Sequence, residues 1–218
     1  MWYAGSAKRV PAAGRPEMLR LGFSLAPGMR IGLYGGSFNP VHGGHVQVAR
    51  TAKARLGLDR LIWLVTPGNP LKADRASADL ASRVAAARKA AGPGMIVSDL
   101  EAALGSAFSI DTLHVLRARY PKVQFVWVMG TDNLAGFHHW RGWRQILRQV
   151  PVVVVARPGQ ILAGLSSPAA RRFASARRPI SQARRLALAP PPAWIYLPMP
   201  LNPLSSTAIR ATRIAPSQ

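Results

Sequence analysis

Two histidines three positions apart, His42 and His45, stand at the start of a predicted helix that closely follows the glycine pair Gly35 and Gly36. Residues three apart on a helix project from the same face, so both imidazoles would point toward one ligand. Glycine can adopt backbone angles closed to other residues and lets an anion approach the main chain. A helix start adds unpaired N–H groups and a positive dipole end, which favour phosphate. The pattern indicates phosphate binding, although a metal-binding histidine pair or a plain helix start would show the same residues.

Three further positions offer groups suited to a nucleotide. Ser109 opens the run Ser-Ile-Asp-Thr and is predicted to be the N-cap of a helix whose free N–H groups can hold an anion. Asp132 follows a predicted strand and is suited to a ribose hydroxyl or to water around a metal, with helix capping as the competing interpretation. Trp140 offers a flat face to a heteroaromatic ring, and such stacking contributes about 1–3 kcal/mol per base.

Two segments supply additional anion-binding groups. Lys72 ends the loop Pro-Gly-Asn-Pro-Leu-Lys after the second predicted strand, where its ammonium group would reach phosphate as a point charge. Ser205, Ser206 and Thr207 lead into a short predicted helix with Arg210 on its first turn. Two anion-binding helix starts in one chain favour a polyphosphate ligand more strongly than either start does alone.

Short β-rich runs alternate along the chain with helical stretches rich in Ala, Arg and Leu, which is typical of βαβ units and a parallel sheet. The predicted strands are 31–34, 61–65, 95–97, 123–129, 152–156 and 194–197. The predicted helices are 45–56, 80–91, 110–120, 143–149 and 169–186. Right-handed crossovers then give an α/β fold with a Rossmann-like, doubly wound parallel sheet and a ligand crevice at the carboxyl ends of the strands.

The composition narrows the classes of protein that the chain can belong to. Lys and Arg total 29 against 8 Asp and Glu, and the resulting net charge of +21 favours anionic partners, either nucleic acid or phosphorylated metabolites. The absence of cysteine excludes disulfides, thiolate chemistry and a Cys-ligated zinc site, and it is compatible with the cytoplasm. We expect residues 1–28 to form a loosely ordered extension, residues 29–218 a single domain, and the Arg-rich segment around 157–185 a solvated surface.

The motifs together make the chain similar to the bacterial nicotinate mononucleotide adenylyltransferases, members of the nucleotidyltransferase superfamily with an HxGH signature. The resemblance runs from Met29 to about Arg213 and follows the order of the family's motifs. These motifs are GGSFNPVHGGH at 35–45, PGNPLK at 67–72, SIDTL at 109–113, GTDN at 130–133 and the tryptophan that follows it, ARPG at 156–159 and SSTAIR at 205–210. The resemblance implies a single nucleotidyltransferase domain over residues 29–218.

The resemblance also implies roles for individual residues. The catalytic residues would be His42, His45 and Arg210. ATP would contact Gly35, Gly36, Ser37, Phe38, His42, His45, Lys72, Asp132, Ser205, Ser206, Thr207 and Arg210. The nicotinate ring would stack on Trp140, and its carboxylate would be received near Ser109 and the backbone around Arg141. Magnesium would arrive with ATP, held mostly by phosphate oxygens and water and without a metal site built by the protein.

The implied reaction transfers the adenylyl group of ATP to nicotinate mononucleotide and gives deamido-NAD and pyrophosphate. ATP and the mononucleotide are thus the expected partners, with a cytoplasmic location, no membrane and no specific nucleic acid. The oligomeric state stays open between a monomer and a homo-oligomer. Another HxGH enzyme, such as a phosphopantetheine adenylyltransferase, is the alternative within enzymes. A basic RNA-binding module is the alternative from another class, supported by the net charge and the Arg-rich segment.

Overall fold

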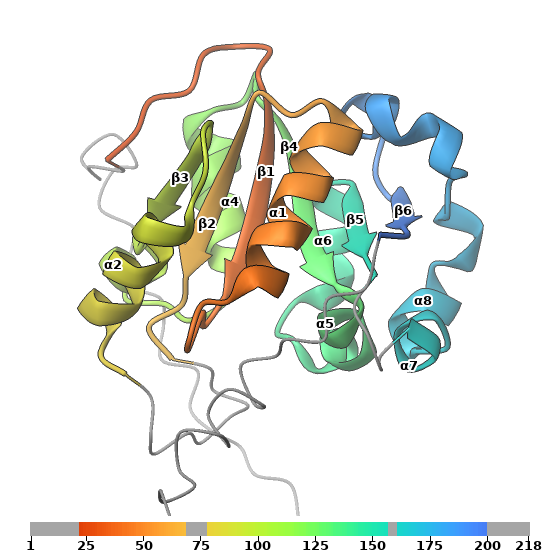
Figure 1. The fold of residues 1–218 in the computed structure, drawn as a ribbon. Coiled ribbons are helices and arrows are strands. Elements are labelled where there is room, and N and C mark those ends of the chain that lie inside the picture. The colour runs from red at the N-terminus through yellow and green to blue at the C-terminus, as the bar shows by residue number, and fades with distance from the viewer. Residues whose placement is uncertain (1–21, 69–77, 157–160, 200–218) are drawn as a thin grey trace, which may run out of the picture.

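The computed structural model describes residues 22–68, 78–156 and 161–199. In this part of the chain six strands form one sheet in which every neighbouring pair is parallel. The strand order is β3-β2-β1-β4-β5-β6, so the chain reverses direction across the sheet between β1 and β4 (Figure 1). The strands are β1 (Arg30–Gly36), β2 (Arg60–Val65), β3 (Met95–Ser98), β4 (Gln124–Gly130), β5 (Val152–Val155) and β6 (Trp194–Leu197).

Helices cover both faces of this sheet. In Figure 1, α1 lies in front of the strands, while α4 and α6 lie behind them. The α-helices are α1 (Gly43–Leu56), α2 (Leu80–Ala90), α3 (Leu100–Ala103), α4 (Ser109–Arg119), α5 (Thr131–Gly136), α6 (Trp143–Gln149), α7 (Ile161–Leu165) and α8 (Pro168–Arg172). The 3-10 helices are η2 (Phe137–His139), η3 (Ala174–Ala176) and η4 (Ile180–Leu188). The predicted Rossmann-like, doubly wound parallel sheet is confirmed.

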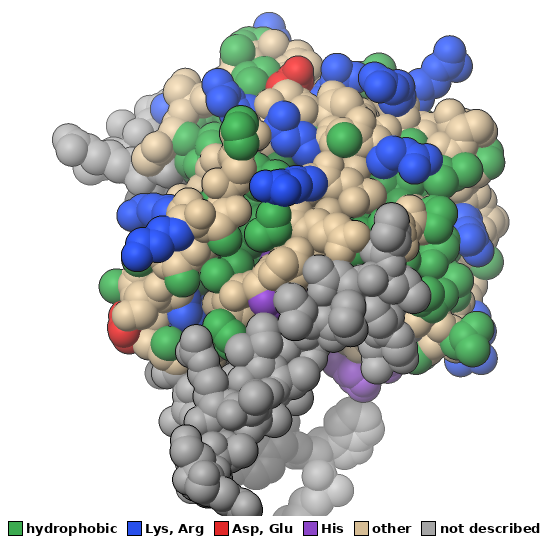
Figure 2. Space-filling view, in the orientation of Figure 1, with side chains coloured by type: hydrophobic (Ala, Val, Ile, Leu, Met, Phe, Trp, Pro, Cys, Tyr) green, Lys and Arg blue, Asp and Glu red, His purple; other side chains and the backbone are tan. Residues whose placement is uncertain are grey.

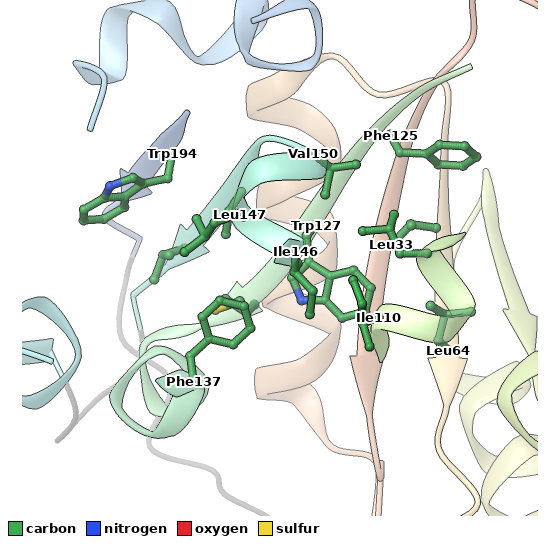
Figure 3. Close-up of a cluster of buried hydrophobic side chains, with 14 of the residues drawn as sticks. Leu33, Leu64, Ile110, Phe125, Trp127, Phe137, Ile146, Leu147, Val150 and Trp194 are labelled. Atoms are coloured by element: carbon green, nitrogen blue, oxygen red, sulfur yellow. The ribbon is translucent and has the colours of Figure 1, made fainter. Parts of the chain in front are cut away.

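Each strand contributes alternate side chains to two hydrophobic clusters, one on each face of the sheet. On β2, Ile62 and Leu64 face the cluster that α4 and α6 cover, while Leu61, Trp63 and Val65 face the cluster that α1 covers. Successive side chains of a strand point to opposite faces, so a strand covered on both sides must be apolar at nearly every position. Figure 3 shows the first cluster, in which Trp127 of β4 lies beside Ile110 of α4 and Ile146 of α6.

The predicted long helix over 169–186 is wrong. The segment instead forms α8, η3 and η4, which are three short helices. Proline lacks an N–H and disfavours helical backbone in the residue before it, so Pro179 ends any continuous helix at this point and serves as the N-cap of η4. Arg178 donates its backbone N–H to the carbonyl of Trp194 at 2.8 Å, which ties the interruption to the start of β6.

The chain contacts the sheet several residues before the domain boundary that we expected at Met29. Leu25 is 6% exposed within the hydrophobic core. The Tyr120 hydroxyl donates to the carbonyl of Phe23 at 3.1 Å, and the N–H of Gly28 donates to the carbonyl of Lys122 at 2.8 Å. Residues 1–21 of the predicted extension lie outside the described residues. None of the described helices has the length and apolar composition needed to cross a membrane.

Candidate functional site

A cavity of about 270 Å³ opens at the carboxyl edge of the sheet, where β1, β2 and β4 end. This edge, at the point where strand order reverses, is where open α/β sheets bind ligands. Its walls come from segments that are far apart in the sequence: the ends of β1 and β2, the region of α3 and the start of α4, and the segment from α5 to Arg141. The lining residues are Gly35, Gly36, Ser37, Thr66, Gly68, Glu101, Ala107, Phe108, Ser109, Asn133, His139, Trp140 and Arg141.

Gly35 and Gly36 line the cavity as predicted, but the structural reason for glycine differs from the expected one. Both residues belong to β1, and neither has a positive φ. A Cβ atom on Gly35 would lie 3.1 Å from the Trp127 ring, and one on Gly36 would lie 3.0 Å from the Phe38 ring. The expectation of unusual backbone angles is therefore wrong, and close packing against these two rings is what favours glycine at the strand end. Phe38 is the residue with a positive φ, of 47°.

His42 and His45 cap the helix that they begin. His42 is the N-cap residue of α1, and its Nδ1 accepts the N–H of Gly44 at 3.1 Å. The Nδ1 of His45 in turn accepts the N–H of His42 at 3.3 Å, which completes a capping box. The two rings lie 3.9 Å apart between centroids, and both residues are buried. The plain helix start considered from the sequence is thus real, and it fixes the orientation of both imidazoles.

The capping box also decides against the metal-pair interpretation. Because each Nδ1 accepts a backbone N–H, it carries no proton, and the proton of the neutral ring sits on Nε2. A histidine that binds a metal through Nε2 needs the opposite arrangement, with Nδ1 donating to an acceptor. His42 and His45 are therefore arranged as hydrogen-bond donors, which suits phosphate oxygens.

Phe38, predicted to contact ATP, packs against His45. Its side chain is 1% exposed. The ring meets His45 edge to face at 5.1 Å between centroids and packs against Trp63 at 4.8 Å. In this structure the buried side chain helps to hold the His45 ring in place, and the predicted contact of Phe38 with ATP stays a prediction.

Trp140 and Arg141 form one wall of the cavity together with Phe108. Trp140 is half-buried, and its ring is held edge to face by Phe137 at 5.2 Å and by Trp127 at 6.4 Å. The Arg141 guanidinium lies 4.7 Å from the centroid of the Phe108 ring. The wall therefore combines a fixed aromatic ring with a cation, which suits an aromatic ligand that carries negative charge.

Ser109 lines the cavity, but it is not the N-cap that we predicted. The N-cap of α4 is Phe108, whose side chain makes no capping hydrogen bond, and Ser109 is the first helical residue. Ser106 supplies the local hydrogen bonds instead, because its hydroxyl accepts the N–H of Phe108 at 3.1 Å and donates to Asp111 at 2.7 Å. The hydroxyl of Ser109 is thereby released from capping and bonds to Glu101.

The remaining predicted residues are either exposed or outside the part of the chain that the structure describes. Asp132 is exposed in the first turn of α5, and its neighbour Asn133 lines the cavity in its place. Ser37 is exposed at the end of β1 and lines the cavity. The others lie outside the described residues: Lys72, Ser205, Ser206, Thr207 and Arg210.

Two buried charged residues beside the cavity were missed by the sequence reasoning. Glu101 is 2% exposed, and its burial raises the pKa of the carboxyl to about 7, while hydrogen bonds from Thr66 and Ser109 act in the opposite direction. Arg83 is 4% exposed, and desolvation lowers the pKa of its guanidinium. One sequence signal was available for Arg83, because it stands beside Val84 and four residues before Ala87 on the buried face of α2.

Comparison with known proteins agrees with this geometry. The cytidylyltransferase-like family profile matches residues 33–212, which places the chain among the nucleotidyltransferases. Curated relatives named "Probable nicotinate-nucleotide adenylyltransferase" include a protein of Caulobacter sp. (strain K31), 61% identical over 84% of this chain and 97% of that protein. Another, from Rhizobium meliloti (strain 1021), is 52% identical over 85% of this chain and 99% of that protein. The chain belongs to the nicotinate-nucleotide adenylyltransferase family.

A solved structure shares the fold at much lower identity. It is the Plasmodium falciparum nicotinic acid mononucleotide adenylyltransferase complexed with NaAD, with a TM-score of 0.62 and 14% identity. The match covers 84% of this chain and 83% of that one. This comparison supports the doubly wound sheet independently of sequence similarity.

Proposed function

We propose that the site at the carboxyl edge of the sheet transfers the adenylyl group of ATP to nicotinate mononucleotide, a step of NAD biosynthesis. A 5′-phosphate oxygen of the mononucleotide attacks the α-phosphorus of ATP and forms a new P–O bond. The bond from the α-phosphorus to the bridging oxygen breaks, and pyrophosphate leaves with its electron pair. The second pKa of a phosphate monoester is near 6, so the attacking oxygen is already ionised at neutral pH and needs no general base.

One observation carries the proposal above all: the end of β1 lines the cavity, and the chain continues from there into the start of α1, where His42 and His45 lie outside the cavity lining. On one side, the capping box of α1 presents the two histidines as donors from Nε2. On the other side, the cavity is walled by Trp140, Phe108 and Arg141. Donors suited to phosphate and an aromatic, cationic pocket are what the two substrates of this family require.

We assign ATP to the histidine half. His42 and His45 donate to the phosphate oxygens on which charge develops in the transition state, and Gly35, Gly36 and Ser37 let the nucleotide lie close to the backbone. Such donors, held in place before the reaction, accelerate phosphoryl transfer without forming a covalent bond to the substrate. Lys72, Ser205, Ser206, Thr207 and Arg210 are proposed to complete this half from the sequence resemblance.

We assign the mononucleotide to the cavity. The pyridine ring stacks on Trp140, and its carboxylate lies near Ser109 and the backbone around Arg141, at the positive start of α4. The Plasmodium falciparum nicotinic acid mononucleotide adenylyltransferase, which shares this fold, was solved as a complex with NaAD, and this supports a dinucleotide-sized site on the fold. The activity is assigned to a single domain, which begins before Met29 because Leu25 belongs to its core, and to the cytoplasm, where ATP is abundant.

Magnesium is proposed to enter with ATP. Among residues 22–68, 78–156 and 161–199, no group of three or more His, Cys, Asp or Glu side chains gathers as a metal-ion site. Asp132 is exposed on the first turn of α5, which fits the usual binding of magnesium by one carboxylate together with phosphates and water. When bound, the ion neutralises phosphate charge.

A pyrophosphate-release assay tests the proposal with ATP and a panel of acceptors: nicotinate mononucleotide, nicotinamide mononucleotide and phosphopantetheine. We expect the highest kcat/KM with nicotinate mononucleotide and formation of deamido-NAD in equal amount to pyrophosphate. Preferred use of phosphopantetheine would assign the chain to a different reaction of the same superfamily. Absence of release with every acceptor, together with tight RNA binding, would favour the nucleic-acid alternative.

A further inference from the structure

Glu101 places an acid in the wall of a pocket that is otherwise suited to an anion. It belongs to the short helix α3, is 2% exposed, and lines the cavity together with Thr66 and Ser109. The hydroxyls of these two residues donate hydrogen bonds to its carboxyl group. An ionised carboxylate at this position would repel the carboxylate of nicotinate, so its protonation state bears directly on which substrate the pocket accepts.

Burial favours the neutral form of Glu101, because a carboxylate loses its hydration when it is removed from water. Hydrogen bonds from the Thr66 and Ser109 hydroxyls favour the ionised form instead. Thr66 has a single hydroxyl proton, and it donates this proton to the carbonyl of Gly68 at 2.9 Å, which limits its support of the carboxylate. Burial is the larger effect and raises the pKa of this carboxyl to about 7.

The state of Glu101 also sets the direction of the Ser109 hydroxyl. An ionised carboxylate takes the hydroxyl proton, so Ser109 then presents only lone pairs to the cavity. A neutral Glu101 leaves that proton available to point into the cavity and to donate to an anion. A nicotinate carboxylate needs such donors, whereas a nicotinamide brings two N–H donors of its own and gains from acceptors.

We infer that Glu101 is a specificity-determining residue that, in its neutral form, makes the pocket selective for the carboxylate of nicotinate over the carboxamide of nicotinamide. This inference rests on the proposed function. Other titratable or charged groups near the pocket are Arg141 and His139 in its lining, Asp99 at the N-cap of α3, and Asp111 of α4. Asp111 accepts from Ser106 at 2.7 Å, and Asp99 is exposed.

The test measures kcat/KM for nicotinate mononucleotide and for nicotinamide mononucleotide between about pH 6 and about pH 9, and takes the ratio of the two values. The 5′-phosphate titrates alike in both substrates, and so does ATP, so their contributions cancel in the ratio. The comparison with Glu101→Gln separates the contribution of Glu101 from that of the other groups in the lining. We expect the ratio in the wild-type protein to fall about tenfold or more across this range, because Glu101 ionises within it. Glu101→Gln stays neutral, so its ratio should remain high and independent of pH.

Asp99→Asn is the matched control, since it removes one exposed carboxylate from the N-cap of the same helix, where the side chain makes no capping hydrogen bond, and it should retain the wild-type profile. A wild-type ratio that is independent of pH, in an enzyme active with nicotinate mononucleotide, would overturn the inference alone. Full pH dependence of the ratio in Glu101→Gln would overturn the inference as well. If Glu101→Gln does not fold, the wild-type profile and the pH dependence of thermal protection by the two mononucleotides decide the question. No turnover of either mononucleotide would instead overturn the proposed function and the inference with it.

Discussion

His42 and His45 combine two roles that are usually separate, because the ring nitrogen that caps the helix fixes the nitrogen that faces a ligand. The cap uses Nδ1 of each ring and so determines that Nε2 carries the proton. A mutation at either position changes both helix stability and the presentation of the donor. The two effects can be separated by choosing a substitution that still caps.

His42→Asn and His42→Ala should differ in stability and agree in activity. Asparagine is among the best N-cap residues, so His42→Asn should keep the free energy of unfolding close to that of the wild type, while His42→Ala should lose about 1 kcal/mol. Both variants lack the Nε2 donor, and kcat should fall about 100-fold or more in each. Denaturant unfolding and steady-state kinetics measure the two effects. Wild-type kcat in His42→Asn would show that capping is the only role of this histidine.

Glu101 should make the stability of the protein fall as the pH rises between its two pKa values. The carboxyl has an ordinary pKa of 4.5 when unfolded and one of about 7 when folded, so the folded state holds more protons in this interval. Stability is therefore highest below pH 4.5 as far as this group is concerned, and the loss at neutral pH approaches about 3 kcal/mol. Unfolding of Glu101→Gln compared with the wild type at several pH values measures this contribution, and parallel curves would contradict it.

At the scale of elements, Arg83 of α2 joins the segments that follow β1 and β2. Its guanidinium donates to the carbonyls of Ser37 at 2.8 Å, Thr66 at 2.7 Å and Pro67 at 3.0 Å. Its Nε donates to the carbonyl of Ala78 at 2.9 Å. The planar fork of arginine satisfies four carbonyls at once, so one side chain sets the spacing between the two strand ends that border the cavity.

Arg83→Met should preserve the volume of the side chain and leave these carbonyls without their donor. We expect a loss of stability of about 3 kcal/mol and a higher KM, because the strand ends that border the site lose their common anchor. Arg88→Met, at an exposed position in the last turn of the same helix, is the control and should change the stability by less than about 0.5 kcal/mol. Equal effects of the two substitutions would exclude an anchoring role.

The sequence predicted the elements better than the contacts between them. All six predicted strands are present, with ends that shift by one or two residues, because a strand buried on both faces leaves a clear apolar run. The helix over 169–186 failed because Ala- and Arg-rich composition suggests a helix while Pro179 interrupts it. Gly35 was assigned to the site for a wrong reason, since the Trp127 ring that favours a glycine comes from β4, which is far along the sequence and adjacent to β1 only in the fold. Glu101 and Arg83 were missed because their partners are brought together only by the fold.

At the scale of the whole molecule, the first described residues belong to the folded unit. A protein lacking residues 1–21 keeps the contacts of Phe23, Leu25 and Gly28, whereas one lacking residues 1–28 loses all of them. We expect the shorter deletion to unfold like the full chain and the longer one to lose at least about 2 kcal/mol, mainly from burial of Leu25. Thermal unfolding of both proteins measures the difference, and identical melting temperatures would show that these contacts add nothing.

The excess of positive charge is also a property of the whole molecule. Lys and Arg side chains are spread over the face shown in Figure 2, and acidic side chains are sparse there. Arg171, Arg178 and Arg185 are exposed on the segment from α8 to η4, and none of them lines the cavity. A distributed positive field attracts anionic substrates from a distance, and salt screens it over about 8–10 Å. We therefore expect this charge to act on the rate of substrate capture.

Replacing these three arginines with glutamine should lower kcat/KM for ATP and nicotinate mononucleotide by a few-fold at low ionic strength and leave kcat unchanged. The dependence of kcat/KM on salt should become shallower in the same variant, because fewer charges remain to be screened. The triple substitution with lysine keeps the charge and should behave like the wild type. Steady-state kinetics at several salt concentrations, together with an RNA-binding titration, distinguish this interpretation from a nucleic-acid surface. If the glutamine variant loses RNA binding while kcat/KM and its salt dependence stay at wild-type values, the charge on this segment serves a polyanionic partner and not the capture of substrate.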